Sequence, residues 1–138
     1  MLEAVVDASV VVKWFVEEEG SGKALEVRDR YVSGELKLIA PELLPFEVLN
    51  VLYYKRLFTI EELKSVAEAL DAFFFELYPL RGEYAKLTLE VAQENNITIY
   101  DAAYVSLAIL KNARLYTADA KLKERLTGKR SNYVTLLK

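Results

Sequence analysis

The chain contains no histidine and no cysteine. These absences exclude imidazole as a general base, thiolate as a nucleophile and the Cys/His cages that hold zinc. Any catalysis must therefore use carboxylates, hydroxyls, amines or a metal ion bound through oxygen. The lack of cysteine also agrees with a reducing compartment.

Long hydrophobic runs are missing as well. No segment approaches the roughly 18 uninterrupted apolar residues of a membrane-spanning helix, and MLEAVVDASV lacks the basic start of a signal peptide. We therefore expect a cytoplasmic protein without a membrane partner. A length of 138 residues with 53% hydrophobic residues fits a single domain, residues 1–138, with a buried core.

Positive charge is in slight deficit, because the formal net charge is −3. Affinity for phosphate groups comes largely from Lys and Arg, so this balance by itself argues against a nucleic-acid partner. From Asp119 onward, however, basic side chains outnumber acidic ones. Two interpretations stay open at this point, a basic rim around an acidic pocket or an ordinary solvated helix face.

Strand-like and helix-like segments alternate along the chain. Short apolar runs at residues 3–6, 37–41, 112–117 and 132–137 predict strands, and segments with helical apolar spacing separate them. Such alternation is typical of βαβ units and of a mainly parallel sheet. The sequence therefore predicts an α/β fold.

The middle of the chain makes three further local predictions. Residues 42–58 are apolar almost all round, which predicts a helix buried on most of its sides. A second helix is expected from Thr59, where Glu62 completes a capping box. The segment ITIY, residues 97–100, has the pattern of a strand, and TGKRSN, residues 127–132, that of a loop.

Three of the five aspartates follow β-branched or aromatic runs, in AVVDAS (Asp7), ITIYDAA (Asp101) and RLYTADA (Asp119). In an open parallel sheet, ligands bind beyond the carboxyl ends of the strands, so these carboxylates are candidates for one site. Each of them alone has a plainer explanation. Asp7 and Asp119 fit helix N-caps, and Asp101 fits the acidic end of a capping box that begins at Thr98.

Glu47, in LLPFEVLNVL, lies among apolar residues at helical offsets of three to five. An ionised carboxylate in such surroundings is costly unless Lys or Arg pairs with it or it binds a metal. Asn50, one turn later, extends this polar stretch. The sequence leaves both explanations of Glu47 open.

Carboxylates that converge need a cation. Two of them about 4 Å apart repel by several kcal/mol at an effective dielectric constant of about 20, so four together would take up protons without compensation. Mg²⁺ and Mn²⁺ prefer oxygen ligands, turn water into a nucleophile and stabilise a phosphate undergoing displacement. Phosphodiester hydrolysis by this route requires no histidine.

Four segments, VVDASVVVKWF, PELLPFEVLNVL, IYDAAYVSLA and LYTADAKL, resemble the motifs of PIN-domain nucleases, specifically VapC-type toxins. The resemblance spans nearly the whole chain and rests on four acids in the family's order. It implies a three-layer α/β/α sandwich with a mainly parallel sheet of four or five strands. It also implies that ITIY leads into the helix that bears Asp101.

The same resemblance assigns roles by position. It implies an endoribonuclease whose acidic quartet holds Mg²⁺ or Mn²⁺. The quartet consists of Asp7, Glu47, Asp101 and Asp119. Asp7 and Asp101 match the most direct metal ligands, and Ser9 and Thr117 match polar positions that support the site.

Partners are implied as well, namely an RNA substrate, a cognate antitoxin of the VapB type and a second copy of the chain in a homodimer. Tyr53, Tyr54, Phe58 and residues 73–75 supply more aromatic surface than one small core obviously requires, which is typical of a permanent interface. Plain core packing is the alternative explanation.

Three other functions compete with a toxin nuclease. The first is an RNA-processing nuclease that is not a toxin, and the second is a non-catalytic binding module whose acids only cap helices. The third is a phosphatase with an aspartyl nucleophile. The phosphatase is disfavoured, because Ser9 stands where the second acid of a D-x-D motif is expected.

Overall fold

The computed structural model describes residues 2–137, which form alternating strands and helices. The strands are β1 (Leu2–Val6), β2 (Leu36–Pro41), β3 (Glu76–Tyr78), β4 (Arg114–Thr117) and β5 (Val134–Leu136). The α-helices are α1 (Ala8–Val12), α2 (Ser21–Val32), α3 (Leu44–Lys55), α4 (Ile60–Ala72), α5 (Gly82–Asn95), α6 (Ile99–Lys111) and α7 (Ala120–Arg125). A 3₁₀ helix, η1 (Gly128–Tyr133), precedes β5.

The five strands form one parallel sheet in the order β3-β2-β1-β4-β5. The chain moves outward from β1 to β3 and then crosses back to β4, so the strand order reverses between β1 and β4. Ligand sites of open α/β sheets lie at such a switch point, beyond the carboxyl ends of the strands. The predicted mainly parallel sheet is confirmed.

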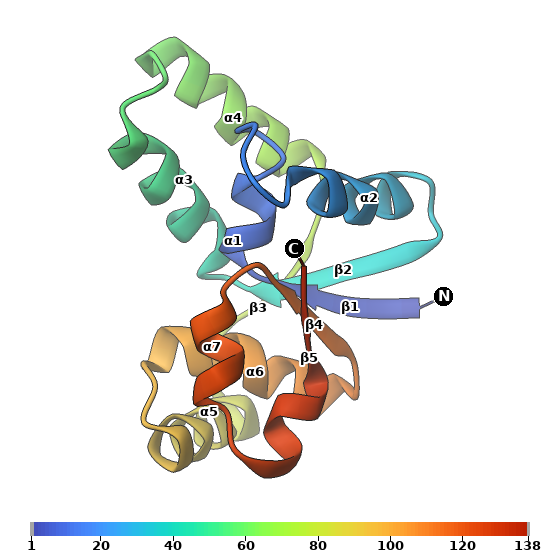
Figure 1. Cartoon of the computed structure of the whole chain (residues 1–138), viewed down its shortest axis with the longest axis vertical. Coiled ribbons are helices and arrows are strands. Elements are labelled where there is room, and N and C mark those ends of the chain that lie inside the picture. The colour runs from blue at the N-terminus through green and yellow to red at the C-terminus, as the bar shows by residue number, and fades with distance from the viewer. Residues whose placement is uncertain (1, 138) are drawn as a thin grey trace.

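Helices cover both faces of this sheet. Helices α1 to α4 lie on one side, and α5 and α6 pack together on the other (Figure 1). This arrangement is the three-layer α/β/α sandwich that the family resemblance implied. It follows from parallel pairing, because each crossover between parallel strands places its helix against a face of the sheet.

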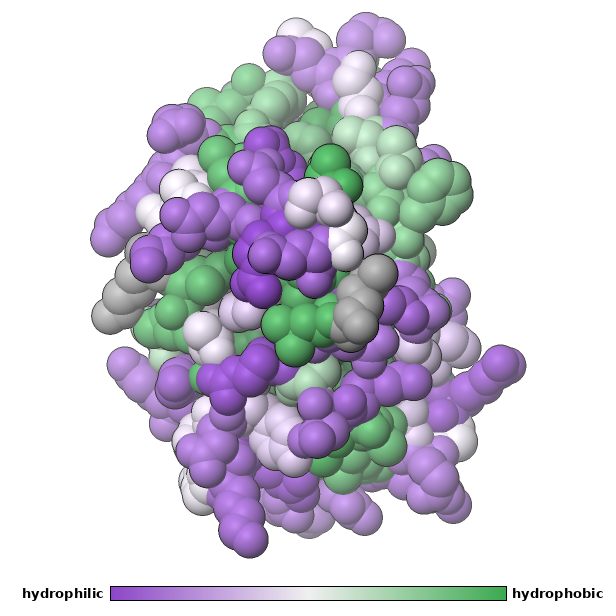
Figure 2. All heavy atoms as spheres, turned by 90° about the vertical axis from the view of Figure 1, so that its right-hand side faces the viewer, coloured by the Kyte–Doolittle hydropathy of each residue, from purple (hydrophilic) through white to green (hydrophobic). Residues whose placement is uncertain are grey.

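The amino edge of the sheet, where β1 and β2 begin, is the face turned toward the viewer in Figure 2. Hydrophilic side chains cover most of this face, with hydrophobic groups between them (Figure 2). Within residues 2–137, no helix combines the length and the apolar character needed to cross a membrane.

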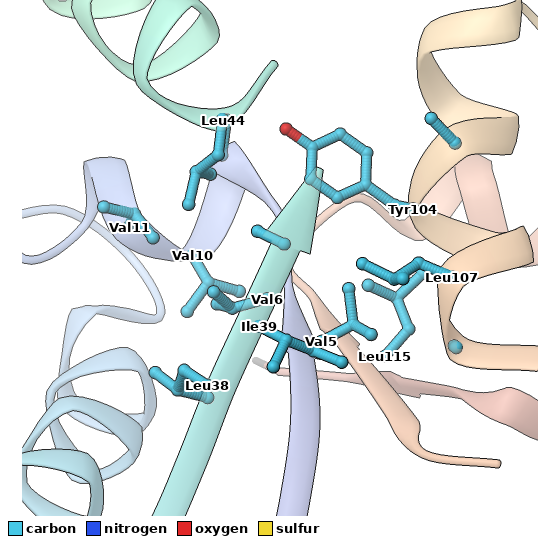
Figure 3. Packing of buried hydrophobic residues seen from close by; sticks show 14 of the residues in the cluster. Val5, Val6, Val10, Val11, Leu38, Ile39, Leu44, Tyr104, Leu107 and Leu115 are labelled. Carbon is cyan, nitrogen blue, oxygen red and sulfur yellow. The ribbon is translucent and has the colours of Figure 1, made fainter. Parts of the chain in front are cut away.

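The core lies on both sides of the central strand β1. Val5 faces Ile39 of β2 and Leu115 of β4 in the sheet register, and all three side chains are fully buried (Figure 3). Strands buried on both faces need nearly continuous apolar runs, which explains the sequences AVV and LIAP.

Helix α3 is buried along one stripe only, so the prediction of burial on most sides is wrong. Leu44, Val48 and Leu52 recur every four residues and face the interior, whereas Phe46 is 76% exposed and Tyr54 64% exposed. The reason is that α3 packs against α1 and α4, while its other face projects away from the sheet (Figure 1).

Two local predictions from pattern are also wrong. Residues 99 and 100 of ITIY belong to α6, as the family resemblance implied, because the Thr98 hydroxyl caps this helix by accepting the N–H of Asp101 at 3.0 Å. Most of TGKRSN, expected as a loop, forms η1. The helix expected from Thr59 is present, with both hydrogen bonds of its capping box to Glu62.

Candidate active site

The carboxyl edge of the sheet brings the four predicted acids to one side of the fold. Asp7 follows β1, and Asp119 lies just beyond β4, the neighbouring strand. Helix α6 leads back to the start of β4, so its first turn, which carries Asp101, lies at the same edge. Glu47 is in the first turn of α3, which starts soon after β2 ends.

Asp7 is the most buried of the four, with only 7% of its surface exposed. Its Oδ1 accepts a hydrogen bond from the Ser9 hydroxyl at 2.5 Å and one from the Val10 N–H at 3.4 Å, and its Oδ2 accepts one from Thr117. Burial raises the pKa of Asp7 to about 6 although these three donors lower it, and the negative charge of Asp119 raises it further.

The two hydroxyls also join Asp7 to the segment that carries Asp119. Ser9 Oγ accepts the Ala118 N–H at 2.8 Å, and Thr117 Oγ1 accepts the Asp119 N–H at 3.0 Å. Each hydroxyl therefore donates to a carboxylate and accepts from backbone. The family resemblance assigned Ser9 and Thr117 to supporting positions, and both hydroxyls donate to Asp7.

Asp119 is the N-cap of α7, as its plainer explanation proposed. Its Oδ1 accepts the N–H groups of Lys121 at 3.0 Å and Leu122 at 3.3 Å. Its Oδ2 makes no hydrogen bond with any residue between 2 and 137. Asp7 likewise caps α1 through Val10. Both acids therefore cap helices, and Asp119 keeps one oxygen without a hydrogen bond among residues 2–137.

Asp101 is half-buried in the first turn of α6. Burial raises its pKa, and the negative charge of Asp119 raises it further. The Thr98 hydroxyl and the positive charge of Arg125 act in the opposite direction. Asp101 is thus linked electrostatically both to the neighbouring acid and to the basic helix α7.

Glu47 is also half-buried, and its partner is a tyrosine. The hydroxyl of Tyr104, on α6, donates to Oε1 of Glu47 at 2.6 Å. Burial raises the pKa of Glu47, whereas the bond from Tyr104 lowers it and the charge of Asp101 raises it. The alternative in which Lys or Arg pairs with Glu47 is wrong for residues 2–137. Asn50 is exposed and lines an apolar groove whose lining residues include none of the four acids.

Tyr104 is the site residue that sequence reasoning missed. It stands three residues after Asp101 on an apolar helix, a spacing that places both side chains on one helical face. Buried tyrosine hydroxyls usually find a hydrogen-bond partner. The sequence could therefore have indicated a hydrogen-bonded tyrosine on the face of Asp101, but it could not have identified Glu47 as the partner.

The described part of the chain supplies no counter-charge in contact with the acids. None of the ion pairs formed by residues 2–137 includes a member of the quartet. Across the same residues, no three acidic side chains come close enough to enclose a metal ion by themselves. Magnesium usually keeps several waters and uses one or two carboxylates, so an all-oxygen set of this kind fits a hydrated divalent ion.

Comparison with known proteins agrees with this fold. The PIN domain family matches residues 4–125. Ribonuclease VapC3 from Pyrobaculum aerophilum is 34% identical over 128 residues, which cover 90% of this chain and 95% of that protein. The crystal structure of PAE2754 from Pyrobaculum aerophilum is 25% identical in sequence and superposes with a TM-score of 0.65. The match covers 92% of this chain and 81% of the PAE2754 chain. A toxin-antitoxin complex from Klebsiella pneumoniae, 17% identical, shares the fold with a TM-score of 0.70 over 98% of both chains. The chain belongs to the PIN domain family.

Proposed function

We propose that this protein is a metal-dependent endoribonuclease that hydrolyses RNA phosphodiester bonds, and that it is the toxin of a toxin-antitoxin pair. The observation that carries the proposal is the acidic edge itself. Four acids lie at the carboxyl edge of the sheet without a basic partner among residues 2–137, and the charge of a neighbouring acid raises the pKa of Asp7, Glu47 and Asp101 in addition to their burial. Its relative VapC3 is named a ribonuclease.

The residues divide the work of holding an ion. Asp7 and Asp101 are proposed as direct ligands, and Glu47 and Asp119 as ligands that act directly or through water. Ser9 and Thr117 hold Asp7 in one orientation and favour its ionised form. When bound, Mg²⁺ or Mn²⁺ would supply a Lewis acid and a water of lowered pKa.

The RNA backbone is proposed to meet the basic helix α7. Lys121 and Arg125 are exposed on this helix, immediately after Asp119. Lys123 is already engaged, because its ammonium donates to the Val134 carbonyl at 3.0 Å. The charge of Arg125 lowers the pKa of Asp101, which supports a basic rim beside the acids over a remote solvated face.

The protein partners are proposed to cover the apolar side of α3. A groove of about 420 Å³ lies between α3 and α4, and a hollow of about 270 Å³ lies between α3 and the start of α6. Phe46 lines both of them. We assign this surface to an antitoxin and to a second copy of the chain, and the protein to the cytoplasm where its RNA would be.

The first experiment is cleavage of a long unstructured RNA by purified protein with Mn²⁺, with EDTA and with Asp101→Asn. The matched control is Asp71→Asn, on the exposed surface of α4. We expect RNA cleavage that requires metal. It should survive in Asp71→Asn and be lost in Asp101→Asn.

Other outcomes point elsewhere. Phosphate release from a small phosphomonoester without RNA cleavage would favour the phosphatase. If Mn²⁺ neither supports cleavage nor raises the melting temperature, the acids have structural roles only and the binding module is favoured. A small antitoxin gene next to the gene of this protein would favour a toxin over an RNA-processing nuclease.

A further inference from the structure

One side chain connects the two helices that carry Glu47 and Asp101. Tyr104 is only 2% exposed, lies on α6 and points its hydroxyl toward the start of α3, near Leu44 (Figure 3). The hydroxyl donates to Oε1 of Glu47 at 2.6 Å. Asp101 stands on the same helix, three residues earlier. The phenol therefore links Glu47 to the helix of a second acid.

We propose that Tyr104 is a positioning residue for the divalent ion, holding Glu47 through Oε1 so that Oε2 is the oxygen available to the cation or to one of its waters. This inference rests on the proposed function, because it presumes that the acids bind metal. Among the described residues, Oε2 has no hydrogen-bond partner. A free glutamate has several rotatable bonds, and one charge-assisted bond removes much of that freedom before an ion arrives.

The chemistry of the two groups fixes Tyr104 as the donor. A tyrosine hydroxyl carries a proton at neutral pH, since its ordinary pKa is about 10, and a carboxylate only accepts. The contact of 2.6 Å therefore holds Oε1 of Glu47 against the phenol.

A second buried tyrosine shows how a purely structural hydroxyl is satisfied. Tyr84, on α5, donates to the backbone carbonyl of Ala103 at 2.7 Å. That contact joins α5 to α6 without an ionisable group. Tyr104 instead donates to a half-buried carboxylate. Burying an ionised carboxylate costs free energy, and binding a cation would offset that cost. The pair Tyr104 and Tyr84 thus offers a matched comparison.

The test measures Mn²⁺ affinity of metal-free protein without RNA, at pH 8, by calorimetric titration and by the electron paramagnetic resonance signal of free Mn²⁺. Three proteins are compared, the wild type, Tyr104→Phe and the control Tyr84→Phe. We expect Tyr104→Phe to weaken Mn²⁺ binding by about tenfold or more. The control Tyr84→Phe also loses a buried hydrogen bond, so its melting temperature should fall. Its Mn²⁺ affinity should equal that of the wild type.

A double-mutant cycle shows whether Tyr104 acts through Glu47. In a Glu47→Gln background, Tyr104→Phe should cause no further loss of Mn²⁺ affinity. Should Tyr104→Phe fail to fold, Glu47→Asp tests the same link, because it keeps the charge but retracts the carboxylate from the phenol. Weaker Mn²⁺ binding by Glu47→Asp is then expected, together with a lower melting temperature, because the buried phenol loses its hydrogen-bond partner.

Three results would overturn the inference while leaving the nuclease proposal in place. The first is that Tyr104→Phe, or Glu47→Asp if that variant is used, binds Mn²⁺ as tightly as the wild type. The second is that Tyr84→Phe loses as much Mn²⁺ affinity as Tyr104→Phe. The third is that Tyr104→Phe causes its full loss of Mn²⁺ affinity in the Glu47→Gln background as well. If the wild type itself binds no Mn²⁺, the inference and the metal-dependent nuclease fall together. RNA cleavage assays on the wild type then show whether any nuclease activity exists without metal.

Discussion

The hydroxyl of Thr117, the last residue of β4, donates a hydrogen bond to Oδ2 of Asp7, which directly follows β1. The bond crosses the point where the strand order of the sheet reverses. The position of the most buried acid is therefore set by pairing between two central strands, which is a rigid part of the fold. A site built on strand ends holds its geometry better than one built on long loops.

Replacing Thr117 with valine tests this link. The variant keeps the shape of the side chain but removes a donor to Asp7 and an acceptor for the Asp119 N–H. We expect the free energy of unfolding at pH 8 to fall by about 1 to 3 kcal/mol. The pKa of Asp7 should rise above its value of about 6, because one donor that lowers it is gone.

Carboxyl ¹³C NMR titration reports the pKa, and urea unfolding reports the stability. Thr135→Val is the matched control, since the Thr135 hydroxyl bonds with Arg114 and with no aspartate. An Asp7 pKa that stays the same in Thr117→Val would show that this hydroxyl does not govern the acid.

Asp7 should also make the metal-free protein less stable as the pH rises. Its pKa is raised from 3.8 to about 6 in the folded protein, so the folded state binds this proton more tightly than the unfolded chain. The contribution to stability is complete below 3.8 and is lost as the pH rises through about 6. The raised pKa values of Glu47 and Asp101 act in the same direction.

The variant Asp7→Asn removes the cost of the buried charge. In EDTA at pH 8, its free energy of unfolding should exceed that of the wild type by about 1 to 3 kcal/mol. The difference should shrink toward pH 4, where the wild-type carboxyl carries its proton in the folded state. Urea unfolding from pH 4 to pH 8 gives the comparison, and a difference that does not vary with pH would contradict the assigned pKa.

The layers of the fold follow from the sequence, whereas the burial of α3 does not. Apolar runs such as residues 3–6 match strands buried on both faces, and parallel crossovers then dictate the sandwich. Helix α3 has apolar residues on every side, and pattern alone equates apolar with buried. Phe46 and Tyr54 are exposed because nothing in residues 2–137 covers them, which composition cannot reveal.

The site shows the same division between local and long-range information. The sequence places Asp7 and Asp119 just beyond strands, which predicts the same edge of a parallel sheet for both. That these two strands are neighbours is known only from the structure. The bond between Tyr104 and Glu47 joins residues that are 57 positions apart. It depends on how α6 packs beside α3, which has no signature in either segment. The predicted quartet itself stays a prediction until metal binding is measured.

The exposed face of α3 should control self-association. Phe46 is 76% exposed, and Val51 and Tyr53 are also exposed on α3. If this surface joins two copies, Phe46→Ser should lower the apparent mass in sedimentation equilibrium from a dimer to a monomer without lowering the melting temperature of the monomer. Leu89→Ser, on exposed α5 surface, is the control and should remain a dimer. A wild type that is monomeric at all concentrations would contradict the homodimer.

Substitutions of Asp119 separate its two proposed roles. Serine is a good N-cap without charge, and alanine is neither cap nor ligand. Asp119→Ser should keep the stability within a few tenths of a kcal/mol, whereas Asp119→Ala should lose about 1 kcal/mol. Both variants should weaken Mn²⁺ binding and slow RNA cleavage, because both remove the carboxylate.

Thr59→Ala, which removes the cap of α4, is the control for the loss of a cap alone. If Asp119→Ser binds Mn²⁺ and cuts RNA like the wild type, Asp119 is a cap only, and the ion is held by the other three acids.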